Sequence, residues 1–157
     1  MADKNSRKVL AYAPRDIFEK ILEYAVIPTF DLIFHNKDRG VVLVRRKIAP
    51  YRGIWALPGL RMFKPESIED TLKRIARQEI GIEIDPAARR FIGQYVGRFA
   101  SEHHRQDIST CYAVEFNADR VAINTDHFSG HRFIKTKEEI PVKTGAMYRY
   151  FLELFLD

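Results

Sequence analysis

One carboxylate shares the apolar face of a predicted helix. Ile68, Leu72, Ile75 and Glu79 are spaced by four, three and four residues, so they share one side of that helix. A bare charge on a core-facing side is costly unless a basic side chain or a metal ion pairs with it. The alternative is that Glu79 lies at the helix end and leans into solvent.

A sharp turn precedes this helix. The apolar run that begins at Trp55 ends in Pro58-Gly59, and Glu66 follows just before the helix. Taken alone, these residues are compatible with an ordinary turn at Gly59, and Arg74 in the helix with ordinary surface ion pairs.

The helices and strands that position these residues are predicted from hydrophobic periodicity and turn signals. We expect helices at 16–24, 67–81 and 142–156, and strands at 24–34, 40–46, 54–57, 90–99, 109–116 and 132–135. The polar turn at 35–40 predicts a hairpin between the first two strands. Ser67 and Asp70 have the spacing of a capping box, and Gly81 stands where the helix would end. The pattern predicts a mixed α/β sandwich that forms a single domain over residues 1–157, with a short N-terminal helical extension.

Composition limits the function classes. The 157 residues are 46% hydrophobic and 30% charged, a globular balance with no apolar run long enough for a membrane span. With no signal peptide and only one cysteine, Cys111, we expect a cytoplasmic protein without an intrachain disulfide. The net charge of +5 comes from basic residues scattered among acids. This favours a phosphate-bearing small molecule as the partner, and neither nucleic acid nor membrane.

The spacing of the residues around the turn and the central helix resembles that of the Nudix box. Gly59, Glu66, Arg74, Glu79 and Gly81 occupy its positions across a strand–loop–helix unit. The resemblance implies a Nudix-type α/β/α sandwich with a mixed sheet that hydrolyses a nucleoside diphosphate linked to another group, with magnesium or manganese as cofactor. It also implies that the Gly59 carbonyl and Glu79 bind the metal, and that Glu66 and Arg74 stabilise the loop.

Three box positions depart from the family pattern. Leu60 replaces a glycine, Ile75 replaces the glutamate after the arginine, and Gln78 replaces the first of two paired glutamates. A usual member would carry three carboxylates on this helix face, and this chain keeps only Glu79. The sequence therefore predicts a site for one divalent ion, held more weakly than in a usual member.

The altered box resembles that of the GDP-mannose mannosyl hydrolase subfamily, which lacks the same glutamates. The segments around Asp31, Arg61, Gly93-Gln94-Tyr95 and Cys111-Tyr112 are similar to it as well. The resemblance implies that Asp31, Arg61 and Tyr112 bind the substrate, GDP-mannose or GDP-glucose, and that the protein is a homodimer. It also implies attack at the sugar C1, which yields GDP and free sugar, with Arg61 and Arg74 in the catalytic group.

The general base of that subfamily is a histidine in a late loop, beside a glutamine that binds the metal. Here the loop reads Thr125-Asp-His-Phe-Ser-Gly-His-Arg-Phe133. An ungapped alignment places His127 on the glutamine. A shift of one residue places His127 on the base and Asp126 on the metal ligand, and histidine suits a general base near neutral pH. His131 and the His103–His104 pair are further candidates for the base.

Two other functions remain open at this stage. One is ordinary Nudix cleavage at phosphorus of another nucleoside diphosphate derivative. The other is a Nudix-fold nucleotide-binding module that has lost catalysis, since the loss of two carboxylates would also accompany decay. The joint presence of Glu66, Arg74 and Glu79 favours an enzyme.

Overall fold

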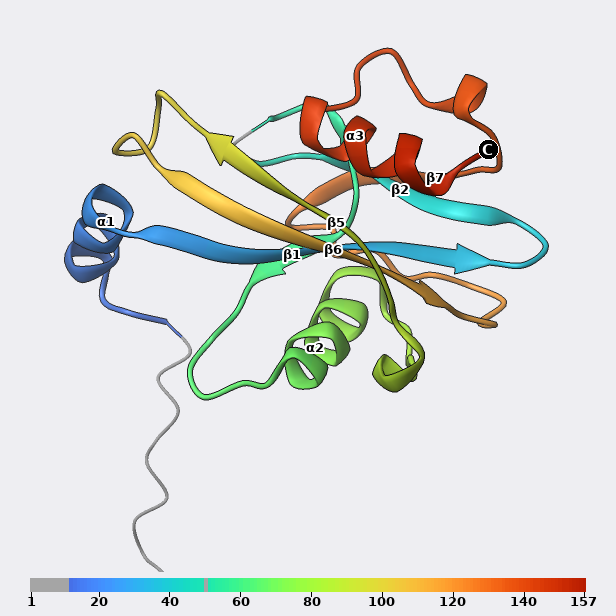
Figure 1. Ribbon diagram of the computed structural model, residues 1–157, viewed down its shortest axis with the longest axis horizontal. Coiled ribbons are helices and arrows are strands. Elements are labelled where there is room, and N and C mark those ends of the chain that lie inside the picture. The colour runs from blue at the N-terminus through green and yellow to red at the C-terminus, as the bar shows by residue number, and fades with distance from the viewer. Residues whose placement is uncertain (1–11, 50) are drawn as a thin grey trace, which may run out of the picture.

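Two long parallel strands run through the middle of the molecule. The computed structural model describes residues 12–49 and 51–157. In it, β1 (Val26–Asn36) pairs with β6 (Gln106–Glu115) over nearly its whole length. Most residues of β1 from Phe30 onward are buried, because helices cover both faces of the sheet (Figure 1).

The remaining strands extend the sheet on both sides of this pair. They are β2 (Gly40–Arg46), β3 (Trp55–Ala56), β4 (Gly59–Arg61), β5 (Arg90–Arg98) and β7 (Phe128–Ile134). The order is β3-β2-β1-β6-β5, with β4 paired to β1 and β7 paired to β2. β1 and β2 are antiparallel and joined by a tight turn, which confirms the predicted hairpin.

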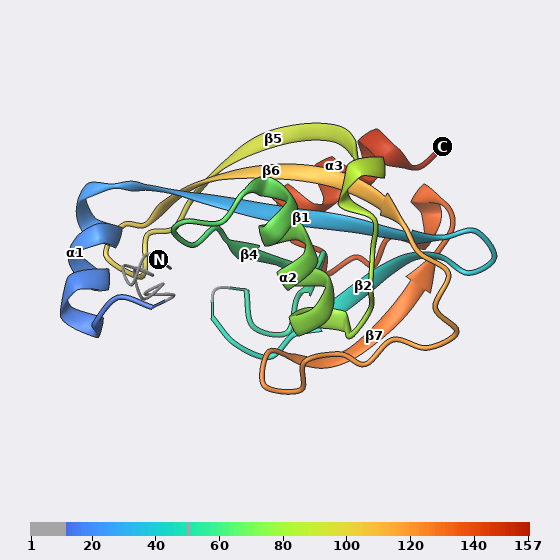
Figure 2. The same ribbon diagram turned by 90° about the horizontal axis from the view of Figure 1, so that it is seen from below.

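Helices α2 (Ile68–Ile80) and α3 (Ala146–Phe155) lie on opposite faces of the sheet (Figures 1 and 2). This confirms the predicted α/β/α sandwich with a mixed sheet. Helix α1 (Arg15–Tyr24) lies at one end of the sheet, apart from α2 and α3, and buries only Leu22. In the described part of the chain, no helix has both the length and the apolar character needed to cross a membrane. Two short 3₁₀ turns, Pro86–Ala88 and Lys137–Glu139, complete the elements.

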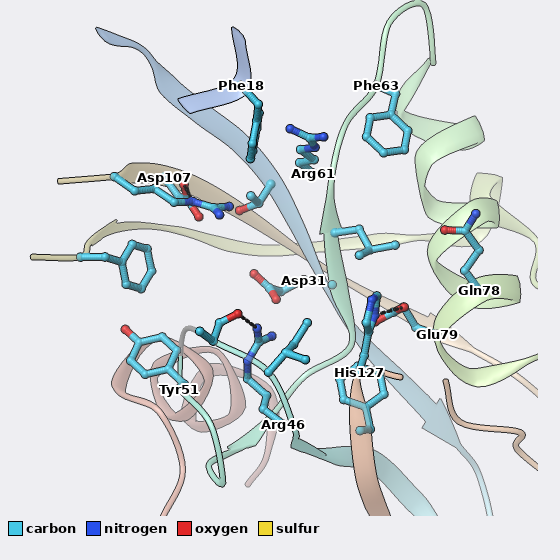
Figure 3. A pocket seen from close by; sticks show the side chains of 18 of the residues that line it. Phe18, Asp31, Arg46, Tyr51, Arg61, Phe63, Gln78, Glu79, Asp107 and His127 are labelled. Atoms are coloured by element: carbon cyan, nitrogen blue, oxygen red, sulfur yellow. Dashed lines mark hydrogen bonds and ion pairs between the residues drawn. The ribbon is translucent and has the colours of Figure 1, made fainter. Parts of the chain in front are cut away.

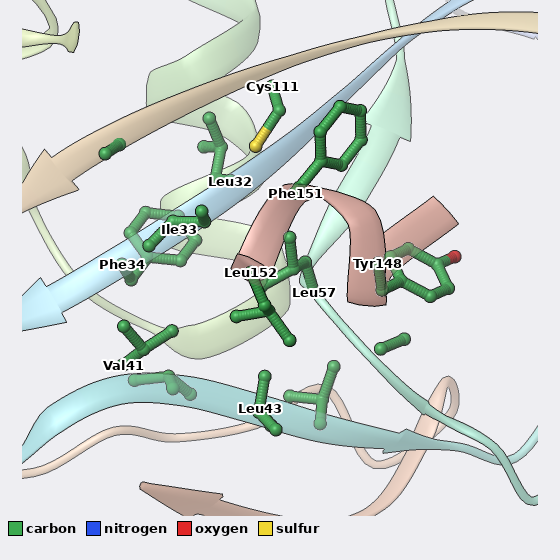
Figure 4. Packing of buried hydrophobic residues seen from close by; sticks show 14 of the residues in the cluster. Leu32, Ile33, Phe34, Val41, Leu43, Leu57, Cys111, Tyr148, Phe151 and Leu152 are labelled. Atoms are coloured by element: carbon green, nitrogen blue, oxygen red, sulfur yellow. The ribbon is translucent and has the colours of Figure 1, made fainter. Parts of the chain in front are cut away.

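The core fills the space between β1, β2 and α3. Phe151 and Leu152 of α3 are fully buried and lie beside Leu57 (Figure 4). Leu32 of β1 and Leu43 of β2 are buried in the same cluster. This packing fixes the sheet against α3 and leaves the loops between the strands to form the functional site.

Both predicted ends of α2 are confirmed. The Ser67 side chain accepts a hydrogen bond from the Asp70 N–H, and the Asp70 side chain accepts one from the Ser67 N–H. Gly81 ends the helix with φ of 65°, a left-handed conformation that favours glycine. Leu72, Ile75 and Glu79 are all buried, as their spacing predicted.

Several elements differ from the predictions. Strand β6 begins at Gln106 and not at residue 109, and β7 begins at Phe128 and not at residue 132. The last helix begins at Ala146 and not at residue 142, because the backbone before it pairs with Trp55: the Trp55 N–H donates to Lys143 O and the Gly145 N–H donates to Trp55 O. Strand β4 was not predicted at all. Its three residues follow a proline and carry no alternating pattern, so tertiary pairing with β1 decides their conformation.

Candidate active site

The loop before α2 is held by one ion pair. Arg74 Nε donates to Glu66 Oε1 at 2.5 Å, and its terminal nitrogen donates to Glu66 Oε2 at 3.0 Å and to the Arg61 carbonyl at 2.6 Å. Glu66 Oε2 also accepts from the Phe63 N–H and the Thr71 hydroxyl. The structure therefore brings together Glu66 and Arg74, as predicted from the sequence, and fixes the backbone that enters the helix.

Gly59 lies too close to Asp31 for any side chain. A Cβ at this position would overlap the Asp31 carboxyl group and the Phe30 carbonyl oxygen. The Leu32 N–H donates to Pro58 O, and hydrogen-bonded pairs alternate along an antiparallel ladder. The neighbouring Asp31–Gly59 pair is therefore a non-hydrogen-bonded pair, in which the strands approach most closely. The Gly59 carbonyl consequently points away from β1, and Gly59 lies in a cavity wall.

Glu79 is buried at the other end of α2 and has two partners from the late loop. His127 Nδ1 lies 2.8 Å from Glu79 Oε1, and Asn124 Nδ2 lies 3.2 Å from the same oxygen. The Asn124 N–H also donates to the Glu79 backbone carbonyl. Burial raises the pKa of Glu79, and the neighbouring His127 and Asn124 oppose that rise. Among the described residues, no donor reaches the second oxygen, Oε2.

The rest of the helix face carries no further acid. Ile75 is fully buried and packs in the core, whereas Gln78 is exposed and borders the cavity. Within residues 12–49 and 51–157, no three histidine, cysteine or acidic side chains come together as a metal cluster. The Gly59 carbonyl and the Glu79 carboxylate are the oxygens at this wall that the Nudix box implies for a divalent ion, and the Gln78 amide borders the same cavity.

A cavity of about 530 Å³ joins these groups to Asp31 (Figure 3). Asp31 is 5% exposed and accepts a hydrogen bond from the Ser109 hydroxyl. Burial raises the pKa of Asp31 to about 7, and nearby Asp107 adds to the rise, while Ser109 and Arg46 oppose it. Near neutral pH this carboxyl group is therefore able to act as either donor or acceptor toward a bound molecule.

Arg61 supplies positive charge to the same cavity. Its guanidinium carbon lies 4.0 Å from the centre of the Phe18 ring and 5.2 Å from that of Phe63. Burial, with Arg105 and Arg74 nearby, lowers the pKa of Arg61, although an arginine stays charged at neutral pH. A guanidinium stripped of part of its water binds phosphate oxygens strongly.

The structure does not bring Tyr112 to the cavity. Asp107 of the same strand lines the cavity, and side chains an odd number of residues apart point to opposite faces of a strand. Tyr112 stacks on Phe30 with ring centres 6.1 Å apart and contacts Phe91 edge-on. We therefore correct the predicted substrate contact: Tyr112 packs against the other face of the sheet.

Asp126 also lies outside the cavity lining. Its side chain is exposed, and its backbone N–H donates to Asn124 Oδ1 in the turn before His127. This turn directs Asn124 and His127 inward and leaves Asp126 in solvent, so we withdraw Asp126 as a metal ligand. His131 and the His103–His104 pair are exposed and do not line the cavity either.

Sequence reasoning missed several polar residues of the site, among them Arg46, Asp107 and Asn124. Arg46 ends an apolar strand at a position that the pattern alone could not distinguish from a solvent-exposed strand end. Asp107 stood two residues before the predicted start of its strand. Asn124 precedes His127 by three residues, and this spacing in the late loop was the available signal for it.

Comparisons with known proteins agree with this geometry. The model of the NUDIX domain family matches residues 26–155. The low-salt glycan biosynthesis protein Agl8 of Haloferax volcanii is 28% identical over 138 residues, which cover 81% of this chain and 84% of Agl8.

Two solved structures share the fold. The MutT protein from Methanosarcina mazei Go1 superposes with a TM-score of 0.71 at 22% identity, covering 83% of this chain and 92% of that one. The NUDIX domain of Shewanella oneidensis NrtR, complexed with ADP ribose, superposes with a TM-score of 0.66 at 18% identity, covering 93% of each chain. The family model extends over most of the chain, and the fold and the box residues agree with it. The chain therefore belongs to the Nudix hydrolase family.

Proposed function

We propose that this chain hydrolyses a nucleoside diphosphate sugar, GDP-mannose or GDP-glucose, to GDP and free sugar with the help of magnesium or manganese. The observation that carries the proposal is the pair formed by Glu79 and His127. The helix face keeps one carboxylate, and a histidine able to act as a base is held 2.8 Å from it. A site with three carboxylates would favour several metal ions and attack at phosphorus.

The residues at the cavity wall fit a single divalent ion. Nudix hydrolases use divalent metal ions. The Gly59 carbonyl oxygen and Glu79 Oε2 are hard oxygen ligands for a cation. Among the described residues, neither oxygen accepts one of the hydrogen bonds that hold the site together. A cation bound there would supply positive charge against the diphosphate of the substrate.

The chain's own residues account for the chemistry at carbon. Glu79 fixes the Nδ1 side of His127, so the opposite ring nitrogen is the one available to take a proton from water. The water oxygen then bonds to the sugar C1 and the bond from C1 to the diphosphate oxygen breaks, with its electron pair leaving on GDP. Arg61 and Arg46 line the cavity and would share that developing charge. Attack from the far side inverts C1.

The relatives support a sugar-nucleotide substrate class. Agl8 is named for glycan biosynthesis, and the NUDIX domain of NrtR holds ADP ribose, a nucleoside diphosphate joined to a sugar.

On α1, the exposed Ile17 and Ile21 offer apolar surface for the homodimer that we expect.

Product identification tests the proposal. The protein is incubated with magnesium and GDP-mannose, GDP-glucose, UDP-glucose or ADP-ribose, and the products are separated by chromatography. We expect GDP and free hexose from a GDP-hexose. Formation of GMP and hexose phosphate would instead indicate ordinary Nudix cleavage at phosphorus. Binding of the nucleotides without any turnover would indicate a Nudix-fold binding module.

A further inference from the structure

A charged pair and two aromatic rings line the end of the cavity away from α2. Asp107 and Tyr51 lie across the cavity from Glu79, with Asp31 between them (Figure 3). Arg105 and Phe99 line the same end. The roles proposed above for the metal, the base and the phosphates use none of these four side chains.

The charged pair presents hydrogen-bonding groups to the cavity. Asp107 is 8% exposed, and Arg105 Nε donates to Asp107 Oδ1 at 2.7 Å. In the described part of the chain no donor reaches Asp107 Oδ2, and Arg105 Nη1 lies 3.9 Å from Glu102, beyond hydrogen-bond distance. An acceptor oxygen of Asp107 and guanidinium N–H groups of Arg105 thus stand side by side at the cavity wall, with capacity left for hydrogen bonds to a ligand. Such groups gain most when a ligand with matching donors and acceptors binds.

The aromatic rings beside this pair suit a flat ligand. Tyr51 and Phe99 meet edge to face with ring centres 5.5 Å apart. Gly97 permits this arrangement, because a Cβ there would lie only 3.2 Å from the Phe99 ring. Both side chains are partly exposed and line the cavity, and an aromatic ring is able to stack on a nucleobase.

The ligand group that occupies the Asp107 end of the cavity is inferred from the chemistry proposed at the Glu79 end, so the inference rests on the proposed function. If the diphosphate lies near Gly59 and the sugar C1 lies near His127, the nucleoside has to extend away from His127. The cavity continues in that direction toward Tyr51 and Asp107, and Phe99 contacts Tyr51.

We propose that Asp107, with Arg105 beside it, reads the base of the nucleotide and selects guanine. The guanine edge presents the O6 acceptor next to the N1–H and N2–H donors, which match an arginine donor followed by a carboxylate acceptor. Adenine presents a lone pair at N1, which a carboxylate repels. Selection therefore depends on the Asp107 carboxylate remaining an acceptor.

Binding of nucleoside diphosphates tests this assignment without turnover. Affinities of the full-length protein for GDP and ADP are measured by titration calorimetry with magnesium present. We expect GDP to bind about 10- to 100-fold more tightly than ADP, the usual effect of a good bidentate contact to a base. Asp107→Asn should lose most of that preference through weaker GDP binding, with ADP affinity nearly unchanged. Asp119→Asn, which alters an exposed acid outside the cavity, should behave like the wild type.

Each contrary result overturns the assignment. Equal affinity of the wild-type protein for GDP and ADP would do so whether or not the variant folds. Unchanged GDP binding by a folded Asp107→Asn variant, with a raised KM for the GDP-hexose, would place the sugar at this end instead. Because GDP is the product, its selective binding would stand even if no GDP-hexose were hydrolysed, so failure of the proposed reaction is a separate result.

Discussion

The two carboxylates that frame α2 differ in how the protein uses their oxygens. Both oxygens of Glu66 accept protein hydrogen bonds, which come from Arg74, Thr71 and the Phe63 backbone. Burial alone would raise the pKa of Glu66, but these donors outweigh it and hold the pKa below its usual range. Among residues 12–49 and 51–157, donors reach only one oxygen of Glu79, and burial raises the pKa of this carboxyl group.

The difference separates a structural carboxylate from a chemical one. Glu66 accepts four hydrogen bonds from the protein, so its contribution is a fixed loop. Glu79 is more deeply buried than Glu66 but keeps an oxygen without a protein donor, which a fold selected for stability alone would not favour. Substitution at Glu79 should therefore act mainly on turnover, and substitution at Glu66 mainly on stability.

The largest effect is expected at Glu79. Glu79→Gln keeps the shape of the side chain but removes the charge that orients His127 and would bind a cation. We expect magnesium-dependent kcat/KM for the GDP-hexose to fall about a thousandfold, within the range typical of losing general-base catalysis. The melting temperature should change little, because glutamine is able to keep a hydrogen bond to Asn124. Near-normal hydrolysis by this variant would place the active site elsewhere.

A smaller effect, mainly on stability, is expected at Glu66. Glu66→Ala leaves Arg74 partly buried without its charge partner, and we expect the free energy of unfolding to fall by about 2–3 kcal/mol. Activity should fall with it, since the loop that carries Gly59 loses its anchor. The matched control is Glu83→Ala, which removes an exposed pair with Arg77 and should lower the melting temperature far less, because solvent screens an exposed pair. Equal melting temperatures for the two variants would contradict the contrast.

The smallest effect is a pH dependence at Asp31, which like Glu79 is a buried acid facing the cavity. The folded chain keeps a proton on Asp31 up to about pH 7, whereas the unfolded chain loses it near 3.8. The contribution of Asp31 to the free energy of unfolding of the wild-type protein therefore falls as the pH rises between these two values. Asn does not titrate, so the melting temperature of Asp31→Asn relative to wild type should rise by about 3 °C or more from pH 5 to 8. A constant difference across this range would contradict the raised pKa.

Local signals made much of the fold predictable. The polar turn at 35–40 between two apolar runs indicated the first hairpin, and the pattern from Ser67 to Gly81 predicted both ends of α2. Strand β4 and the start of α3 were not predictable in this way. Their backbone groups bond to β1 and to Trp55, which lie elsewhere in the sequence, so no local pattern reports them.

The site was predictable where its residues lie within one continuous segment. Gly59, Glu66, Arg74 and Glu79 follow one register along the chain. The roles of the late-loop residues were harder to predict. His127 and Asp126 are neighbours in sequence, and only the geometry of the turn decides which side chain points into the cavity. Asp107 came to the cavity through strand pairing with β1, which joins residues about eighty positions apart.

The position of bond cleavage is the central claim, and hydrolysis in oxygen-18 water tests it directly. The products of GDP-mannose or GDP-glucose hydrolysis are examined by mass spectrometry after a single turnover. A site with one carboxylate and His127 as base predicts that the label enters the free hexose and that GDP remains unlabelled. Label in a phosphate group of the nucleotide or of a sugar phosphate would contradict the account, since water would then have attacked phosphorus.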